Sequence, residues 1–197
     1  MLSTPENGTT QFTIVDAYGN VASVTSTVEG SMGSYHMVDG FLLSNQLTDF
    51  AASPMDSAGV LVANRVEGNK RPRSTMTPML VFKDNNFYLA TGSPGGAAII
   101  QYVVKSLVAD LDWQLNPQQA ANLVNFGANN SATTNIDGSN TALDLQSLVA
   151  ALQAKGHRIN QGAQTSGIAT LRRNANGSYT GGVDPRREGL VLGDGAL

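Results

Sequence analysis

The segment ENGTTQFTIVDAYGNVASVTSTVE, residues 6–29, carries the pattern that decides the fold. Residues 11–17 and 20–29 are rich in Val, Ile, Thr and Phe, and in the second run Val alternates with small or polar residues, which is typical of β-strands. The tetrapeptide AYGN between them, residues 17–20, supplies the Gly and Asn of a tight turn. The segment therefore predicts a β-hairpin near the start of the chain.

The Asn7-Gly8 pair that precedes this hairpin has two interpretations. Asn-Gly is a common pair in tight hairpin turns, and Thr is frequent in the strands on either side of such turns. Alternatively, Gly8-Thr9 is a bond that the protein cleaves in itself, so that Thr9 becomes an N-terminal nucleophile with its own α-amine as general base. The preceding residues MLSTP have no strand pattern that could pair with residues 11–15, which favours cleavage.

Composition excludes several classes of protein. The 197 residues fit one domain with a substantial core. A charged fraction of 14% and a net charge of −3 offer no basic surface for nucleic acid, and no apolar run approaches the ~20 residues of a membrane span. The absence of Cys excludes disulfides, thiolate nucleophiles and Cys-ligated zinc. The two histidines and the carboxylates do not occur at metal-ligand spacing, so the sequence implies no metal and no cofactor.

Periodicity predicts two more hairpins and three helices. The hairpins pair residues 78–82 with 86–92 and residues 166–173 with 178–184. The helices are expected at 94–111, with Pro94 first, at 117–124, with Asn116 as N-cap, and at 142–156, closed by Gly156. Residues 50–70 and 128–140 are expected as loops. This order of strands and helices predicts an α+β layered sandwich. The apolar positions of the first helix are Ile99, Ile100, Val103, Val104, Leu107 and Val108.

Five motifs occur in order along almost the whole chain. They are TTQFTIVDAYGNVASVTSTVE (9–29), GFLLSNQLTDF (40–50), NKRPRSTMTP (69–78), TGSPGG (91–96) and GGVDPRREG (181–189). Together they resemble the small subunit of γ-glutamyltranspeptidases. The resemblance implies the fold of N-terminal-nucleophile hydrolases, a four-layer αββα sandwich shared by two subunits that arise when a precursor cleaves itself. Residues 1–8 then correspond to the end of the large subunit, and residues 9–197 to the small, catalytic subunit.

The resemblance also implies a role for individual residues. Thr9 matches the nucleophile, Thr27 matches the threonine that hydrogen-bonds its hydroxyl, and Gly95 and Gly96 match the oxyanion hole. The substrate-binding positions are Glu29, Gln46 and Asp49 for the α-amino group of the donor, and Ser74 and Thr75 for its α-carboxylate. The sequence departs from the family at Gln11, where members usually carry His, and at Thr75, where they carry Ser. The loop 51–69, which corresponds to a lid in many members, is short and has no aromatic residue.

The implied activity is γ-glutamyl transfer or hydrolysis, acting on glutathione and other γ-glutamyl amides. A large subunit from the same precursor is the expected partner, so the isolated, uncleaved chain is expected to be inactive and to expose apolar surface. One alternative is a cephalosporin or glutaryl acylase, which shares the fold and the nucleophile, and another is an unprocessed chain that acts only as a structural module. The low charge and the abundance of Asn, Ser, Thr, Gln and Gly indicate an exported bacterial protein, periplasmic or secreted.

Overall fold

The computed structural model of the chain describes residues 8–138 and 143–193, which form two compact units. Unit 1 contains the residues up to Thr9 together with Ser26–Thr75. Unit 2 contains Thr10–Thr25 and the chain from Met76 onward. The proposed remnant before the cleavage site lies outside the described residues except for Gly8.

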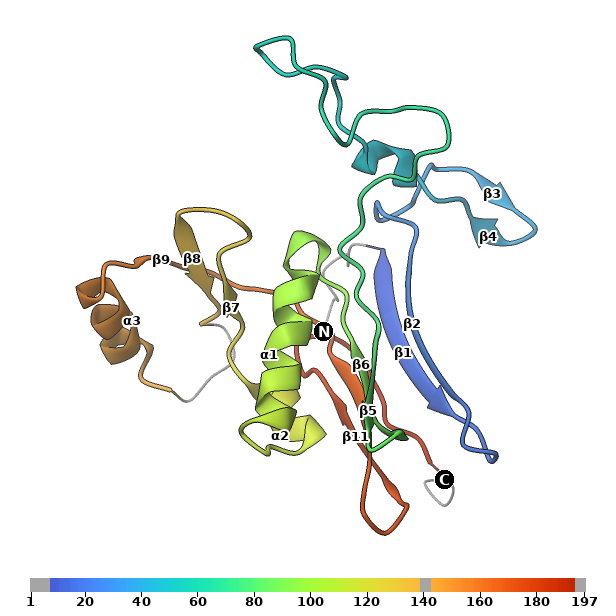
Figure 1. The fold of residues 1–197 in the computed structure, drawn as a ribbon, viewed down its shortest axis with the longest axis vertical. Coiled ribbons are helices and arrows are strands. Elements are labelled where there is room, and N and C mark those ends of the chain that lie inside the picture. The colour runs from blue at the N-terminus through green and yellow to red at the C-terminus, as the bar shows by residue number, and fades with distance from the viewer. Residues whose placement is uncertain (1–7, 139–142, 194–197) are drawn as a thin grey trace. The chain divides into compact units, whose positions relative to one another are not determined.

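The centre of unit 2 is an antiparallel sheet with the strand order β11-β10-β6-β5 (Figure 1). Both hairpins expected from the sequence are confirmed, since β5 (Met79–Lys83) pairs with β6 (Asn86–Gly92), and β10 (Ala169–Arg173) pairs with β11 (Tyr179–Val183). Asp84 and Asn85 connect the first pair with φ of 50° and 63°, the positive values that a two-residue hairpin turn requires. The non-local contact between β10 and β6 joins the two hairpins into one sheet.

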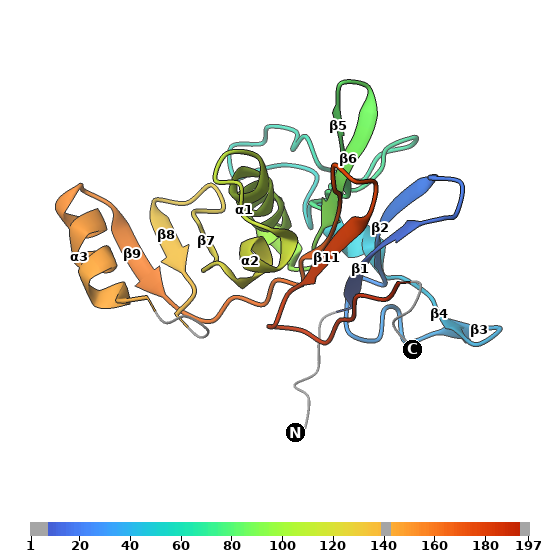
Figure 2. The ribbon, with the colours of Figure 1, turned by 90° about the horizontal axis from the view of Figure 1, so that it is seen from below.

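Two helices pack against one face of this sheet (Figure 2). They are α1 (Ile99–Leu111) and α2 (Pro117–Asn122), and α2 begins as predicted, with Asn116 and Gln119 forming a capping box. The predicted start of α1 at Pro94 is wrong. Gly95 and Gly96 have φ of 139° and 57°, which a right-handed helix cannot contain, so a short 3₁₀ turn, η2 (Gly96–Ala98), comes first.

The buried face of α1 also differs from the prediction. Ile99 and Val103 are buried as expected, but Ile100 and Val104 are about half exposed, at 48% and 52%. Polar side chains occupy the buried face instead, because other elements supply partners for them: Tyr88 and Arg172 bind Asp110, and Asn125 binds Lys105. No helix in the described part of the chain is long and apolar enough to cross a membrane.

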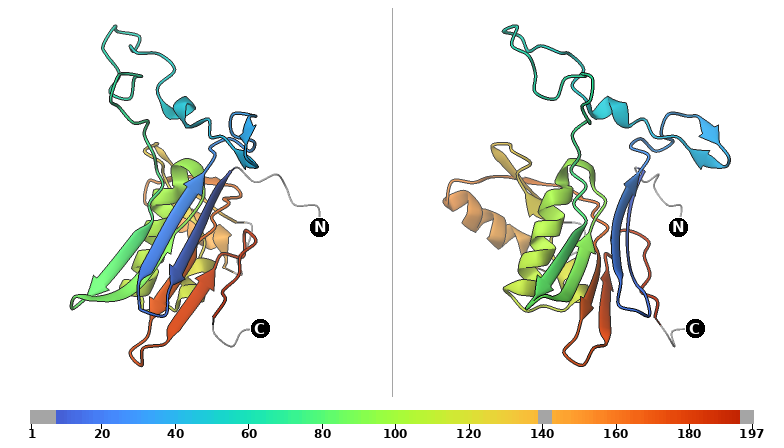
Figure 3. Two further views of the ribbon diagram at one scale, coloured as in Figure 1. Left: turned by 90° about the vertical axis from the view of Figure 1, so that its right-hand side faces the viewer. Right: turned by 45° about the vertical axis from the view of Figure 1, so that its right-hand side comes forward.

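The predicted N-terminal hairpin is confirmed and consists of β1 (Thr9–Val15) and β2 (Val21–Thr27). Within unit 2 it lies on the sheet face opposite to α1 (Figure 3). Its inner side is polar, since Ser23 Oγ donates to Thr91 O at 3.4 Å and the amide of Gln11 lies against Gly92. A Cβ on Gly92 would lie 2.3 Å from Gln11 Oε1, so glycine allows this close approach. Helices, sheet and hairpin thus form successive layers, as the layered α+β prediction requires.

The region after α2 contains strands that the sequence did not predict. The three-stranded sheet β7-β8-β9 consists of β7 (Phe126–Gly127), β8 (Thr133–Ile136) and β9 (Arg158–Gln161), with β8 and β9 parallel. The prediction of a loop over 128–140 is therefore wrong at β8, whose polar sequence TTNI gives no strand pattern. Helix α3 (Leu145–Ala154) confirms the third helix, and Val149 packs with Val124 and Ile136 in a small core.

Unit 1 has little regular structure. Strands β3 (Met37–Val38) and β4 (Phe41–Leu42) form a small hairpin, and a 3₁₀ turn, η1 (Gln46–Asp49), follows. Residues 50–78 are all described and contain no helix or strand, only one isolated bridge between Met55 and Leu61. This confirms the loop expected over 50–70.

Candidate active site

The candidate nucleophile, Thr9, lies at the first residue of β1. Its Oγ1 donates a hydrogen bond of 2.9 Å to Oγ1 of Thr27, the last residue of β2. The hairpin thus brings together two hydroxyl groups that are 18 residues apart in the sequence. Thr27 Oγ1 also accepts a hydrogen bond of 2.8 Å from the backbone N–H of Glu29, which fixes the position of this hydroxyl. The arrangement orients the hydroxyl of Thr9 toward a fixed oxygen that accepts its hydrogen bond.

Glu29 has a strained backbone directly after this pair. Its φ of 72° lies in the left-handed region, which costs a residue with a side chain of this size about 1–3 kcal/mol. Its carboxylate oxygen Oε2 accepts a hydrogen bond of 3.3 Å from Thr48 Oγ1, and Thr48 belongs to η1. The strained conformation therefore places the carboxylate of Glu29 at the turn that carries two other candidate binding residues, Gln46 and Asp49.

Within η1, the side-chain amide of Gln46 donates to the carboxylate of Asp49. The backbone carbonyl of Asp49 accepts a 2.7 Å hydrogen bond from Nδ2 of Asn64, and Oδ1 of Asn64 accepts one of 3.2 Å from the backbone N–H of Arg73. Asn64 therefore connects η1 to the segment that leads into Ser74 and Thr75. Sequence reasoning missed Asn64, because an Asn in a long loop gives no local signal of a non-local bridge.

Unit 1 thus brings together most of the candidate residues. Thr9 and Thr27 share a hydrogen bond, Glu29 is bonded to both Thr27 and η1, and Asn64 joins η1 to the segment before Ser74. Ser74 is exposed and Thr75 is half-buried. Carboxylates and hydroxyl groups gathered in this way suit a ligand that carries both an ammonium and a carboxylate.

The two glycines proposed for the oxyanion hole, Gly95 and Gly96, lie in unit 2. Gly95 requires glycine for two reasons, because its φ is 139° and because a Cβ would lie 2.4 Å from Cε2 of the buried Tyr102. Before it, the fully buried Ser93 accepts a 3.0 Å hydrogen bond from Gly167 N and donates one of 2.6 Å to Pro94 O. Contacts on both sides therefore fix the loop Ser93–Gly96.

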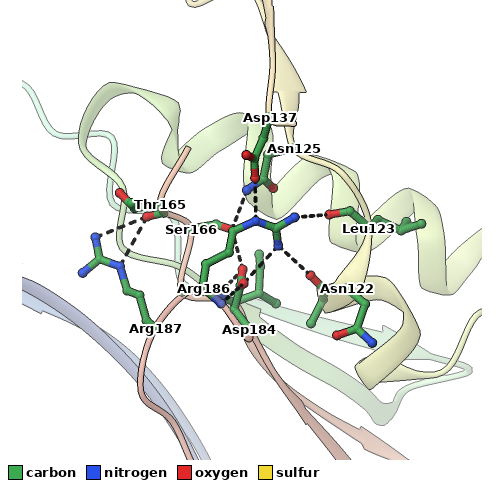
Figure 4. Close-up of polar contacts among 12 residues, drawn as sticks. Asn122, Leu123, Asn125, Asp137, Thr165, Ser166, Asp184, Arg186 and Arg187 are labelled. Atoms are coloured by element: carbon green, nitrogen blue, oxygen red, sulfur yellow. Dashed lines mark hydrogen bonds and ion pairs between the residues drawn. The ribbon is translucent and has the colours of Figure 1, made fainter. Parts of the chain in front are cut away.

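A buried ionic network supports this loop from the GGVDPRREG motif (Figure 4). Arg186 donates to Asp137 at 2.6 Å and to Asp184 at 3.0 Å, and all three side chains are at most 4% exposed. The carboxylate of Asp184 also accepts from Ser166 Oγ and, at 3.3 Å, from Ile168 N. Because Gly167 lies between these two residues, the network positions the N–H that binds Ser93. This motif is therefore structural, a role that the sequence did not indicate.

The pKa values of Lys105 and Arg186 are shifted in the interior at this network. Burial lowers the pKa of Lys105 to about 8, with a further contribution from the charge of Arg186. Burial also acts to lower the pKa of Arg186, but the hydrogen bond to Asp137 and the charge of Asp184 outweigh it and raise this pKa. Lys105 donates to Leu123 O at 3.0 Å and to Asn125 Oδ1 at 2.7 Å, so two of the three donors of its ammonium are hydrogen-bonded inside the protein. Over residues 8–138 and 143–193, no three His, Cys, Asp or Glu side chains gather as a metal site would need.

Comparison of the sequence with known proteins identifies one family. The family profile described as gamma-glutamyltranspeptidase matches residues 3–193. The chain is 32% identical over 194 residues to a glutathione hydrolase proenzyme of Bacillus subtilis (strain 168), a match that covers 95% of this chain and 31% of the relative. It thus spans about a third of the length of that relative.

Solved structures show the same fold. A mutant gamma-glutamyltranspeptidase of Helicobacter pylori is 30% identical and superposes with a TM-score of 0.77, over 90% of this chain and 100% of the other. A cephalosporin acylase of Bacillus halodurans also has a TM-score of 0.77, over 92% of this chain and 33% of the other, but at 23% identity this likeness concerns the fold alone. The N-terminal-nucleophile hydrolase fold expected from the sequence is confirmed.

Proposed function

The chain belongs to the gamma-glutamyltranspeptidase family, and we propose that it is the catalytic small subunit of a γ-glutamyltransferase or glutathione hydrolase. The observation that carries the proposal is the hydrogen bond between Thr9 and Thr27 at the open end of the β1-β2 hairpin. After cleavage between Gly8 and Thr9, the α-amine of Thr9 becomes available as general base beside its own hydroxyl. Nucleophile and base are then supplied by one residue, in a chain without Cys.

The proposed reaction has two steps. The Oγ of Thr9 attacks the γ-carbonyl of the donor, its proton passes to the α-amine and then to the leaving amine, and an ester with Thr9 forms. Water or the amine of an amino acid or peptide then attacks this ester and restores the hydroxyl. In both steps the N–H groups of Gly95 and Gly96 stabilise the tetrahedral oxyanion, a contribution for which the loss of one donor typically costs about 10²–10³ in rate.

The donor substrate is recognised through the two charged groups on its α-carbon, the ammonium and the carboxylate. Glu29, Gln46 and Asp49 hold the α-ammonium, and Ser74 and Thr75 hold the α-carboxylate with their hydroxyl groups. The hydrogen bonds of Glu29 and Asn64 to η1 support this grouping within unit 1. The same carboxylates argue against the acylase alternative, because a glutaryl group has no α-amine to pair with them.

A large subunit from the same precursor completes the enzyme. The length comparison supports this, since the chain spans 31% of a proenzyme but the whole of a solved gamma-glutamyltranspeptidase chain. Exposed apolar side chains support it as well: Ile100, Val104 and Leu111 follow one side of α1, and Phe12 and Ile14 lie on the outer side of β1. We assign residues 1–8 to the end of the large subunit and expect a periplasmic or secreted enzyme.

The test uses the complete precursor, which consists of the proposed large subunit followed by this chain. Intact mass and N-terminal analysis follow the release of a chain that begins at Thr9, and hydrolysis of γ-glutamyl-p-nitroanilide follows turnover. Thr9→Ala is expected to abolish both, whereas Thr10→Ala, at the exposed neighbouring position, is the matched control and retains both. Turnover that survives Thr9→Ala would refute the mechanism, and a precursor of unchanged mass over days would favour an inactive structural module.

A further inference from the structure

The carbonyl group that precedes Thr9 is engaged in a hydrogen bond that the transfer reaction does not use. Gly8 O accepts a bond of 3.0 Å from the backbone N–H of Val28. Gly8 is one residue before the first residue of β1, and Val28 is one residue after the last residue of β2. This bond therefore extends the pairing of the hairpin across the peptide that self-cleavage would break.

Gly8 is needed for this contact because space is short, not because of its backbone angles. A Cβ at this position would lie 2.7 Å from Val28 Cγ2 and 2.8 Å from the backbone oxygen of Gly30. Distances below 3.0 Å force a shift, and Gly30 O belongs to the backbone, so the displaced group would be the segment that holds Gly8. Any larger residue would move the Gly8 carbonyl away from Val28 N.

Asn45 holds the backbone of Val28 in place. The carbonyl of Val28 accepts a 3.2 Å hydrogen bond from Asn45 N, and the side chain of Asn45 accepts one of 2.9 Å from Gly30 N. Asn45 thus binds the backbone on both sides of Glu29. A donor that is fixed before the reaction begins stabilises developing charge at little cost in reorganisation.

We propose that the backbone N–H of Val28 is the oxyanion donor for self-cleavage at Gly8-Thr9, separate from Gly95 and Gly96, which serve the transfer reaction. The inference rests on the proposed function, because it requires that this bond is cleaved. It assigns a catalytic group to the maturation step, located in the same unit as the nucleophile.

The proposed cleavage has two steps, the formation of an ester at Thr9 and the hydrolysis of that ester. Thr9 Oγ attacks the carbonyl carbon of Gly8, the C–O bond forms, and the carbonyl electron pair moves to Gly8 O, where Val28 N–H stabilises it. The C–N bond then breaks, and the hydroxyl proton, directed first toward Thr27 Oγ1, ends on the nitrogen of Thr9. Water hydrolyses the resulting ester, giving its OH to the Gly8 carbon and its remaining hydrogen to Thr9 Oγ.

The experiment removes the N–H of Val28 without changing its side chain. Val28 is replaced by 2-hydroxyisovaleric acid in the complete precursor, which turns its amide into an ester, and the same replacement at Val24 in β2 is the matched control. Release of the chain that begins at Thr9 is followed by intact mass. The ester at Val28 is expected to slow release by about 10²–10³ relative to the ester at Val24. Equal rates for the two esters would overturn the proposal.

A second variant tests the same contact from the other side. Gly8→Ala keeps every N–H but displaces the carbonyl, so release is expected to slow at least about tenfold, and an unchanged rate would count against the proposal. The unmodified precursor separates the two ideas. If it never releases Thr9 or never turns over γ-glutamyl-p-nitroanilide, the proposed function fails, whereas normal release from the ester at Val28 refutes only the role of its N–H.

Discussion

Replacing Gly95 by Ala is the sharpest test of the loop that carries the proposed oxyanion hole. Gly96 provides the matched control, because the same side chain is added one residue later in the same loop. The two variants differ in what the new methyl group meets. At Gly95 it would lie 2.4 Å from Cε2 and 2.9 Å from Cδ2 of Tyr102, whereas at Gly96 no atom lies within 4 Å.

The magnitudes follow from the backbone angles and the packing. At Gly95 the φ of 139° costs a residue with a Cβ about 1–3 kcal/mol, and overpacking against Tyr102 adds about 1–3 kcal/mol. Tyr102 is 3% exposed and packs with Ala98, Ala121 and Ile168, so its ring has little room to move. At Gly96 only the left-handed φ of 57° contributes, about 1–2 kcal/mol. We therefore expect losses of about 2–6 kcal/mol for Gly95→Ala and about 1–2 kcal/mol for Gly96→Ala.

Urea unfolding of the processed enzyme measures the two losses, and γ-glutamyl-p-nitroanilide hydrolysis measures kcat. Gly95→Ala is expected to lower both the free energy of unfolding and kcat more than Gly96→Ala. In a Tyr102→Leu background the cost of Gly95→Ala should fall by about 1 kcal/mol or more, because the clash with the ring is gone. Equal losses for the two alanine variants, or no coupling to Tyr102, would refute the reasoning.

Three further predictions concern other contacts. Thr27→Val removes the acceptor of the Thr9 hydroxyl and should lower kcat about 10- to 100-fold, whereas Thr27→Ser keeps the oxygen and should restore most of it. The lowered pKa of Lys105, about 8 against 10.5, means that the unfolded chain binds more protons above pH 8, so the free energy of unfolding should rise from pH 8 to pH 10. The full shift corresponds to about 3 kcal/mol, and Lys105→Met should remove the rise in urea unfolding at different pH values. Arg186→Met leaves two buried carboxylates without their cation and should cost about 3–5 kcal/mol in urea unfolding, whereas Arg187→Met should cost less than about 1 kcal/mol.

The sequence by itself determined the features that depend on neighbouring residues. Alternating strands joined by Asp84 and Asn85, the capping box that begins at Asn116 and the glycine that closes α3 each involve residues a few positions apart. Their patterns can be read locally because the hydrogen bonds that form them are local. The family motifs, too, are contiguous segments, and the two threonines that they single out as candidate nucleophile and hydroxyl partner are joined by a hydrogen bond at one end of the hairpin.

Only the tertiary structure decided the features that depend on distant partners. The strand Thr133–Ile136 exists because it pairs with Arg158–Gln161, and α1 buries Lys105 and Asp110 because Asn125 and Arg172 bind them. The same holds for Asn64, whose side chain joins η1 to Arg73, nine residues after Asn64 itself. A buried polar group is stable only when it is paired, and pairing across the fold leaves no periodic trace in the chain. The hydrogen bond from Val28 N–H to Gly8 O, on which maturation is proposed to depend, is one of these contacts.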